Sequence, residues 1–209
     1  MTTDVMTQLA ARRPVFHTEA DFQLALAWEI QTSYPHAAIR LEKRMLDNPR
    51  VELDIFVALD GARYGLELKY PRSNLDAEVA GERFILRTGA PDLDRYDVLR
   101  DVARLERLIS EGLIDEGCAL VLTNAPGLWQ PPPRLVAASY DAFRLHDDRE
   151  VTGTVDWGPT AGEGTRTGRA DPIVLTGTYS FRWQDFSEVA GRPFRYLLVP
   201  VRADEPHGA

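Results

Sequence analysis

Cysteine is almost absent from this 209-residue chain, which also lacks long apolar runs and a positive net charge. The single Cys118 excludes a disulfide within one chain, which favours a reducing compartment. No segment approaches the roughly 18 consecutive apolar residues of a membrane span. Residues 1–6 lack the basic and apolar regions of a secretory signal. These absences predict a cytoplasmic protein with no membrane partner.

Three common catalytic patterns are absent as well. The four histidines, at positions 17, 36, 146 and 207, show no metal-ligand spacing with one another or with Cys118. No Gly-x-Ser-x-Gly element marks a hydrolase nucleophile. The glycines of residues 151–171 lack the spacing of a phosphate-binding P-loop, so this segment is expected to be a surface loop.

The composition is that of a soluble globular domain, with 44% hydrophobic and 27% charged residues. A chain of this length forms one domain with a substantial core. The net charge is −8, and neither half of the chain is basic. Because neutralisation of phosphates supplies much of the affinity for DNA, this charge argues against tight non-specific DNA binding. It leaves room for an enzyme with a confined site or one that a partner delivers.

Hydrophobic periodicity and turn residues divide the chain into expected elements. They predict a loose arm over 1–16, a helix from Thr18 to before Pro35, a strand at 37–46, a hairpin over 51–70, a helix at 92–112 and a strand at 118–123. They then predict a short helix at 134–146, a flexible loop at 151–171 and strands at 172–183 and 193–202. The expected fold is an α/β domain with a mixed sheet: an arm (1–16), a core (17–130) and a β-rich C-terminal extension (131–209) packed on the same domain.

The hairpin has the clearest local signal. Asp60-Gly61 favours a two-residue type I′ turn, because both central residues of that turn need positive φ. Such a turn pairs Leu59 with Ala62. Alternation along the first strand then predicts one shared apolar side for Val51, Leu53, Ile55 and Val57.

Continuing this register sets Asp54 opposite Glu67 and Glu52 opposite Lys69. Directly opposed side chains lie about 5 Å apart at Cβ. Two carboxylates at that separation repel each other by about 3 kcal/mol at an effective dielectric constant of about 20. A divalent cation is the natural compensation. The alternative is an ordinary amphipathic hairpin with a solvated charged face, neutralised by a Glu52–Lys69 pair.

Asp54, twelve intervening residues and then Glu67-Leu68-Lys69 form a pattern that resembles the signature of the PD-(D/E)xK nuclease superfamily. The similarity extends over roughly residues 15–125. The chain departs from the motif in having Leu53, in place of proline, before the aspartate. The resemblance implies a restriction endonuclease-like fold with an αβββαβ core, and the same order of elements follows from the periodicity.

The resemblance also implies a metal site. Asp54, Glu67 and the backbone carbonyl of Leu68 would hold Mg²⁺ or Mn²⁺, because Mg²⁺ prefers hard oxygen ligands. Lys69 would position the attacking water or stabilise the transition state. Glu19 would be a further acidic group, although a carboxylate that interacts with the helix dipole explains it equally well.

Two arginines are candidates for substrate contact. Arg72 follows the Glu-x-Lys strand closely, and Arg100 lies on the helix after it. For Arg100 the alternative is an intrahelical ion pair, since charged residues on this helix recur at spacings of three and four.

Three hypotheses follow. The first is a metal-dependent nuclease, endonuclease or exonuclease, acting on DNA in repair or defence, with a homodimer or a protein partner compatible with it. The second is a catalytically inactive nuclease-fold protein that acts as a protein-binding module, which the net acidity favours. The third is an unrelated α+β domain with a charged hairpin, which would tolerate the joint replacement of Asp54 and Glu67.

Overall fold

A six-stranded mixed sheet forms the centre of the protein. The computed structural model describes residues 2–45, 51–132 and 137–203. Across the sheet the strands follow the order β1 (Ala38–Arg44), β2 (Glu52–Leu59), β3 (Ala62–Lys69), β6 (Glu116–Thr123), β10 (Arg192–Arg202) and β9 (Trp183–Val189). Within the described residues, β3 and β6 are the only neighbouring strands of this sheet that run parallel. The predicted α/β domain with a mixed sheet is confirmed.

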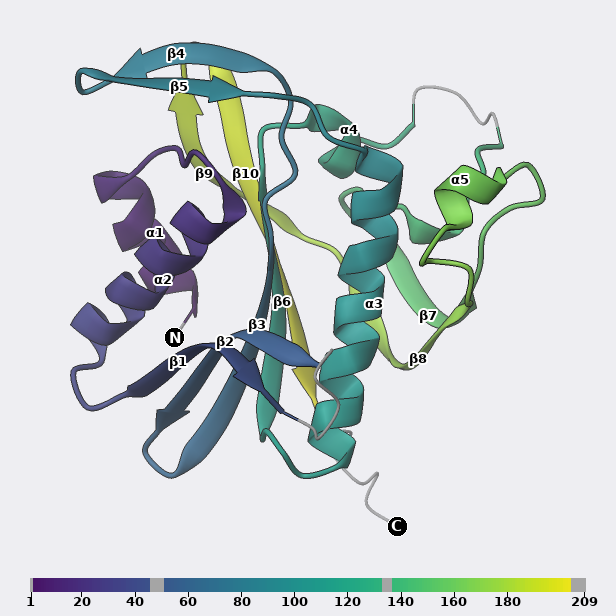
Figure 1. Ribbon diagram of the computed structural model, residues 1–209, viewed down its shortest axis with the longest axis horizontal. Helices are drawn as coiled ribbons and strands as arrows, with labels where there is room; N and C mark the ends of the chain where they lie inside the picture. The colour runs from purple at the N-terminus through teal and green to yellow at the C-terminus, as the bar shows by residue number, and fades with distance from the viewer. Residues whose placement is uncertain (1, 46–50, 133–136, 204–209) are drawn as a thin grey trace.

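Helices cover both faces of the sheet (Figure 1). Two helices, α1 (Thr2–Arg12) and α2 (Glu19–Ser33), pack on one face, and the long α3 (Pro91–Ser110) packs on the other. Each face has its own apolar core. The hairpin of β7 (Glu150–Val155) and β8 (Ile173–Ser180) adds to the core on the α3 side. The remaining helical turns are α4 (Pro126–Trp129), α5 (Glu163–Arg166) and the 3₁₀ turn η1 (Asp141–Phe143).

The predicted turn and cap of the core are confirmed. Asp60 and Gly61 have φ values of 51° and 82°, and β2 pairs with β3 from Leu59–Ala62 onward in the expected register. The hydroxyl of Thr18 accepts a hydrogen bond from the Asp21 amide at 3.1 Å and so caps α2. These local features place the strands and the first core helix.

The predicted loose arm is wrong. Residues 2–12 form the helix α1, in which Val5, Met6 and Leu9 are each 2% exposed or less. Their spacing gives the short helix one apolar side, and this side is buried in the same core as Phe22 of α2. Tertiary packing therefore orders a segment whose short sequence pattern gave little signal.

The C-terminal extension also differs from prediction. The expected loop at 151–171 contains β7 and α5, and β9 falls between the two strands expected there. The strand expected at 193–202 is confirmed as β10. Of the helix expected at 134–146, residues 134–136 lie outside the described residues, and the rest contains only η1. A further hairpin, β4 (Leu75–Val79) with β5 (Glu82–Leu86), was not predicted.

A break in alternation separates the two halves of β2. Leu53 packs in the core on the α3 side, whereas Ile55 and Val57 pack in the core beneath α1 and α2. The prediction that these residues share one face is therefore wrong. The physical reason is an irregularity opposite Asp54: the pairing with β1 passes from Leu41–Ile55 to Lys43–Leu53, and Glu42 has a φ of 48°.

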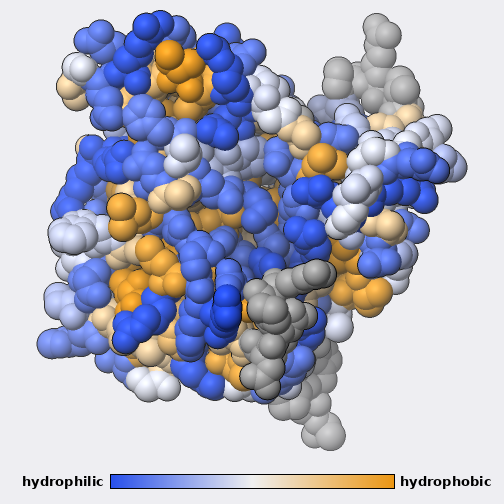
Figure 2. Space-filling view, in the orientation of Figure 1, coloured by the Kyte–Doolittle hydropathy of each residue, from blue (hydrophilic) through white to orange (hydrophobic). Residues whose placement is uncertain are grey.

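Some apolar side chains remain at the surface (Figure 2). Orange areas in this view lie over the β4–β5 hairpin and over β1, and Ile85 and Leu41 are the large exposed hydrophobic residues of those elements. On α2, Leu24 and Trp28 are exposed one turn apart. Within the described ranges, no helix is long and apolar enough to cross a membrane.

Candidate active site

Asp54 lies where β2 and β3 diverge. Their backbone pairing ends at Ile55–Leu66, so the expected direct pairing of Asp54 with Glu67 does not form. Instead, Oδ2 of Asp54 accepts the Leu68 amide at 2.6 Å, and the Asp54 carbonyl accepts Nε2 of Gln23 at 2.8 Å. A side-chain carboxylate thus replaces the backbone acceptor that the ladder would have supplied. This hydrogen bond links the two strands and directs the Asp54 side chain toward the end of β3.

Glu67 points from β3 toward α3. Oε1 of Glu67 accepts Nε of Arg104 at 2.8 Å, and Nη2 of Arg104 contacts Oε2. The Glu67 side chain is fully buried, with 0% of its surface exposed. A buried carboxylate requires a partner of opposite charge, and the planar fork of arginine supplies two contacts at once.

Lys69 also points toward α3. Its Nζ lies 2.8 Å from Oδ2 of Asp101 and donates to the Leu68 carbonyl at 2.9 Å. The Glu52–Lys69 pair of the alternative hairpin does not form, because Glu52 instead pairs with Arg44 at 3.0 Å. Once β2 has diverged from β3, the buried Asp101 is the nearer counter-charge for Lys69.

Glu19 joins the start of α2 to the end of β3. Its Oε2 accepts the Tyr70 amide at 2.7 Å. Its charge also acts on Asp54 and on Lys69. Glu19 therefore belongs to the same cluster as the three motif residues, and its position in the first turn of α2 also suits the helix dipole.

Burial and mutual repulsion perturb the acids of this cluster. Burial raises the pKa of Asp54 from 3.8 to about 6; the Leu68 hydrogen bond and Lys69 lower it, and Asp101 and Glu19 raise it. Burial and then the charge of Asp101 raise the pKa of Glu67 well above its ordinary value, against the lowering effect of Arg104. The carboxylates therefore repel one another electrostatically in a poorly solvated space.

The pKa values of the two cations, Lys69 and Arg104, are also raised, but for a cation this favours the charged form. Burial lowers the pKa of Lys69, but the charges of Asp101 and Glu19 outweigh it, and the net pKa is raised. For Arg104, burial is likewise outweighed by Asp101 and Glu67, and the pKa is raised. Lys69 is therefore an ammonium at neutral pH, suited to holding an anion and unsuited to accepting a proton.

The other two predicted residues have partners of their own. Arg72 donates to the His17 carbonyl at 2.8 Å, and Arg100 pairs with Asp97 at 2.9 Å. The intrahelical ion pair that was the alternative for Arg100 is present. Both arginines lie on elements that border the cluster, since Arg72 follows β3 and Arg100 precedes Asp101 on α3.

Sequence reasoning missed three residues of the cluster, all on α3. Asp101 and Arg104 hold Lys69 and Glu67, and Nη2 of Arg104 also contacts Oδ1 of Asp101 at 2.9 Å. Asp94 has its pKa raised to about 6, by burial first and then by Asp97 and Glu19. The available signal was the acidic stripe at positions 94, 97 and 101, whose helical spacing puts the three on one side of α3.

The donor atoms are those that a hard cation prefers. Asp54 uses Oδ2 for the Leu68 amide, which leaves its second oxygen for a cation. Glu67 and the Leu68 carbonyl instead face Arg104 and Lys69. Among the described residues, no three His, Cys, Asp or Glu side chains form a ready metal cage. The residues fit Mg²⁺ by ligand chemistry, provided that the Arg104 guanidinium leaves Glu67 and that the Lys69 ammonium leaves or shares the Leu68 carbonyl.

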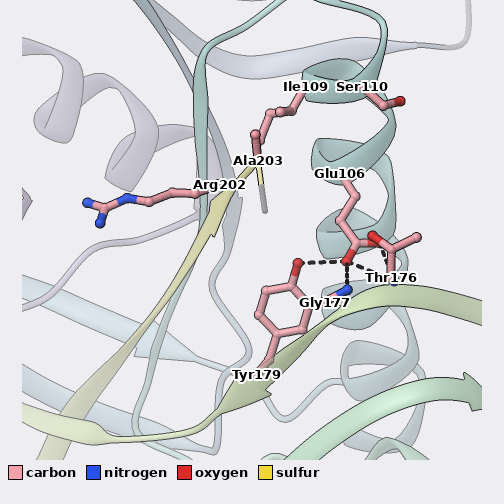
Figure 3. A pocket seen from close by; sticks show the side chains of 8 residues that line it. All are labelled: Glu106, Ile109, Ser110, Thr176, Gly177, Tyr179, Arg202 and Ala203. Carbon is pink, nitrogen blue, oxygen red and sulfur yellow. Dashed lines mark hydrogen bonds between the residues drawn. The ribbon is translucent and has the colours of Figure 1, made fainter. Parts of the chain in front are cut away.

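A separate open pocket of about 410 Å³ lies between α3 and β8 (Figure 3). Its central group is Glu106, whose Oε1 accepts the Gly177 amide and the Tyr179 hydroxyl, each at 2.7 Å. The Thr176 amide donates to both Glu106 oxygens at 3.0 Å. Because these donors use the carboxylate, its evident role is to anchor the β7–β8 hairpin to α3. None of the predicted site residues lines this pocket.

Comparison of the sequence with models of protein families gave no match. Comparison with curated protein sequences gave none either.

Proposed function

We propose that this protein is a metal-dependent phosphodiesterase that cleaves DNA. The observation that carries the proposal is the grouping of Asp54, Glu67 and Lys69 at the diverging ends of β2 and β3. The helix–strand–hairpin–helix–strand order of α2, β1, β2, β3, α3 and β6 supports the restriction endonuclease-like fold, with β4–β5 inserted before α3.

Asp54, Glu67 and the Leu68 carbonyl would hold Mg²⁺ or Mn²⁺. When bound, the metal lowers the pKa of a coordinated water and neutralises charge that develops on the phosphate. Lys69 contributes a permanent positive charge at the same place, since Asp101 and Glu19 keep it protonated. It would orient the attacking water or stabilise the anionic phosphate.

DNA would reach the site along cations that border the cluster. Arg72 and Arg100 are the nearest along the chain, and Arg100 is exposed. Local groups of this kind would offset the net charge of −8 where phosphates bind.

Thermal unfolding with millimolar Mn²⁺ or Mg²⁺ tests the metal site without a known substrate. Wild type should show a higher midpoint with metal, because a ligand that binds only the folded state stabilises it. The double variant Asp54→Asn/Glu67→Gln should lose that response. Glu52→Gln is the matched control, since Glu52 lies on the same strand but pairs with Arg44 outside the cluster.

Activity is then measured on single- and double-stranded DNA. Cleavage that needs Mg²⁺ and disappears in Lys69→Ala, with folding retained, is the expected result. Metal binding without cleavage of any DNA or RNA would refute the phosphodiesterase proposal. A wild type that neither responds to metal nor cleaves would refute the metal site as well.

One observation favours a second candidate function. Arg104 on Glu67 and Lys69 on Asp101 neutralise the buried carboxylates without a metal. That arrangement also suits a nuclease-fold protein that does not cut and instead binds a protein partner. It predicts no metal-dependent change in stability and a stable complex of defined stoichiometry in pull-down.

A further inference from the structure

Arg104 stands between Glu67 and the solvent. Its guanidinium contacts both oxygens of Glu67, and 23% of its side-chain surface is exposed against 0% for Glu67. It also reaches Oδ1 of Asp101 at 2.9 Å. The carboxylate that would bind the metal is therefore already bound to a permanent cation, since arginine does not deprotonate in proteins.

A divalent metal and this guanidinium exclude each other from Glu67. The metal needs one Glu67 oxygen at coordination distance, and both oxygens face Arg104. Two positive groups on one carboxylate would also repel each other in a poorly solvated space. Lys69 presents no such conflict on Glu67, because its contacts are to Asp101 and the Leu68 carbonyl.

Arg104 can move away from Glu67 while Asp101 keeps another counter-charge. The second oxygen of Asp101 keeps the Lys69 ammonium at 2.8 Å, so the charge of Asp101 stays neutralised. The partial exposure of Arg104 gives the guanidinium a route toward solvent, where the planar fork suits a phosphate oxygen. The metal would then replace Arg104 as the counter-charge of Glu67.

We propose that Arg104 is the resting counter-cation of the site and competes with the divalent metal for Glu67. This inference rests on the proposed function, because it assumes a metal at Asp54 and Glu67. It gives α3 a regulatory role: the site holds its metal weakly until Arg104 moves off Glu67.

The test measures Mn²⁺ binding to the full chain by calorimetry and by the electron paramagnetic resonance signal of free Mn²⁺. In Arg104→Gln the dissociation constant should fall at least about tenfold relative to wild type, because a repelling charge is removed from the site. Arg107→Gln is the matched control, since Arg107 lies on the same helix and faces Glu111 at 4.0 Å. Its dissociation constant should equal that of wild type.

Arg104→Lys keeps the test decisive if Arg104→Gln does not fold. Lysine retains the charge but lacks the paired donors that grip Glu67, so Mn²⁺ binding should still tighten, by a smaller factor. Equal or weaker Mn²⁺ binding in the folded Arg104 variants, with wild type binding Mn²⁺, would overturn the competition and leave the proposed function standing. If neither wild type nor any folded variant binds Mn²⁺, the metal site itself is refuted.

Discussion

Asp54→Asn should stabilise the metal-free protein at neutral pH. The pKa of the buried Asp54 is raised from 3.8 to about 6, chiefly by burial. A difference of one unit between the pKa in the folded state and the pKa in the unfolded state corresponds to about 1.4 kcal/mol of folding free energy. The ionised carboxylate therefore costs the folded state up to about 3 kcal/mol above pH 7. Asparagine carries no charge and still offers an oxygen to the Leu68 amide.

The pH dependence of this gain has a defined sign. A carboxyl group with a raised folded pKa binds its proton more tightly in the folded state than in the unfolded one. Between about pH 4 and pH 6 the folded protein therefore carries more protons, and its stability falls as pH rises through that interval. The Asp54→Asn variant does not undergo this loss. Its advantage over wild type should be near zero at pH 4 and reach about 3 kcal/mol above pH 7, and this value already includes the attraction of the ionised Asp54 to Lys69.

Urea unfolding from pH 4 to pH 8 in the presence of EDTA measures both free energies. Glu52→Gln serves as the control, because its exposed pair with Arg44 is worth less than about 1 kcal/mol. Equal or lower stability of the Asp54→Asn variant at pH 7.5 would contradict the claim that Asp54 is held ionised at a cost. A gain that does not change between pH 4 and pH 7 would contradict its electrostatic origin.

Three further substitutions test contacts elsewhere in the fold. Glu106→Gln should lower the unfolding free energy by about 1–3 kcal/mol, because one amide or hydroxyl donor of the β7–β8 hairpin loses a charged acceptor; urea curves measure it, and no loss would contradict the anchoring role. Gly65→Ala should cost about 1–3 kcal/mol, since an added Cβ would lie 2.9 Å from Cδ1 of Ile114 and 3.0 Å from Cδ1 of Leu53, both buried; a neutral result in the same assay would show that both side chains move aside freely. Trp28→Ser should change the unfolding free energy by less than about 0.5 kcal/mol, because Trp28 is 71% exposed; a loss above about 1.5 kcal/mol would contradict the exposed position of Trp28.

The part of the candidate site that the sequence predicts depends on residues that lie close together in the chain. The Asp60-Gly61 turn requires positive φ at both residues, and it sets the register that brings β2 and β3 together. That short-range constraint is sufficient to place Glu67 and Lys69 on one side of β3 and Asp54 close to its end. It did not predict the divergence of the strands at Asp54, where the Gln23 side chain of α2 and the Leu68 amide of β3 donate hydrogen bonds to Asp54.

The partners of these residues could not be predicted in the same way. Asp101 and Arg104 are more than 30 positions away from Lys69 and Glu67 in the sequence. Within α3, Asp101 and Arg104 already form an ion pair with each other, so the sequence does not show that they need further partners. Only the packing of α3 across the sheet decides which charges face the buried carboxylates. The same holds for α1, whose few apolar residues become a buried face only when they pack against α2 and β9.

The sequence by itself determined the local elements of the core: the capped helix after Thr18, the hairpin turn, the periodic helix α3 and the apolar strand β6. Each of these depends on propensity, turn geometry or periodicity over a few residues. The tertiary structure decided the electrostatics, including whether Glu67 meets an arginine, a lysine or open solvent. Charge interactions depend on distance and burial in three dimensions, and residues far apart in the chain set both.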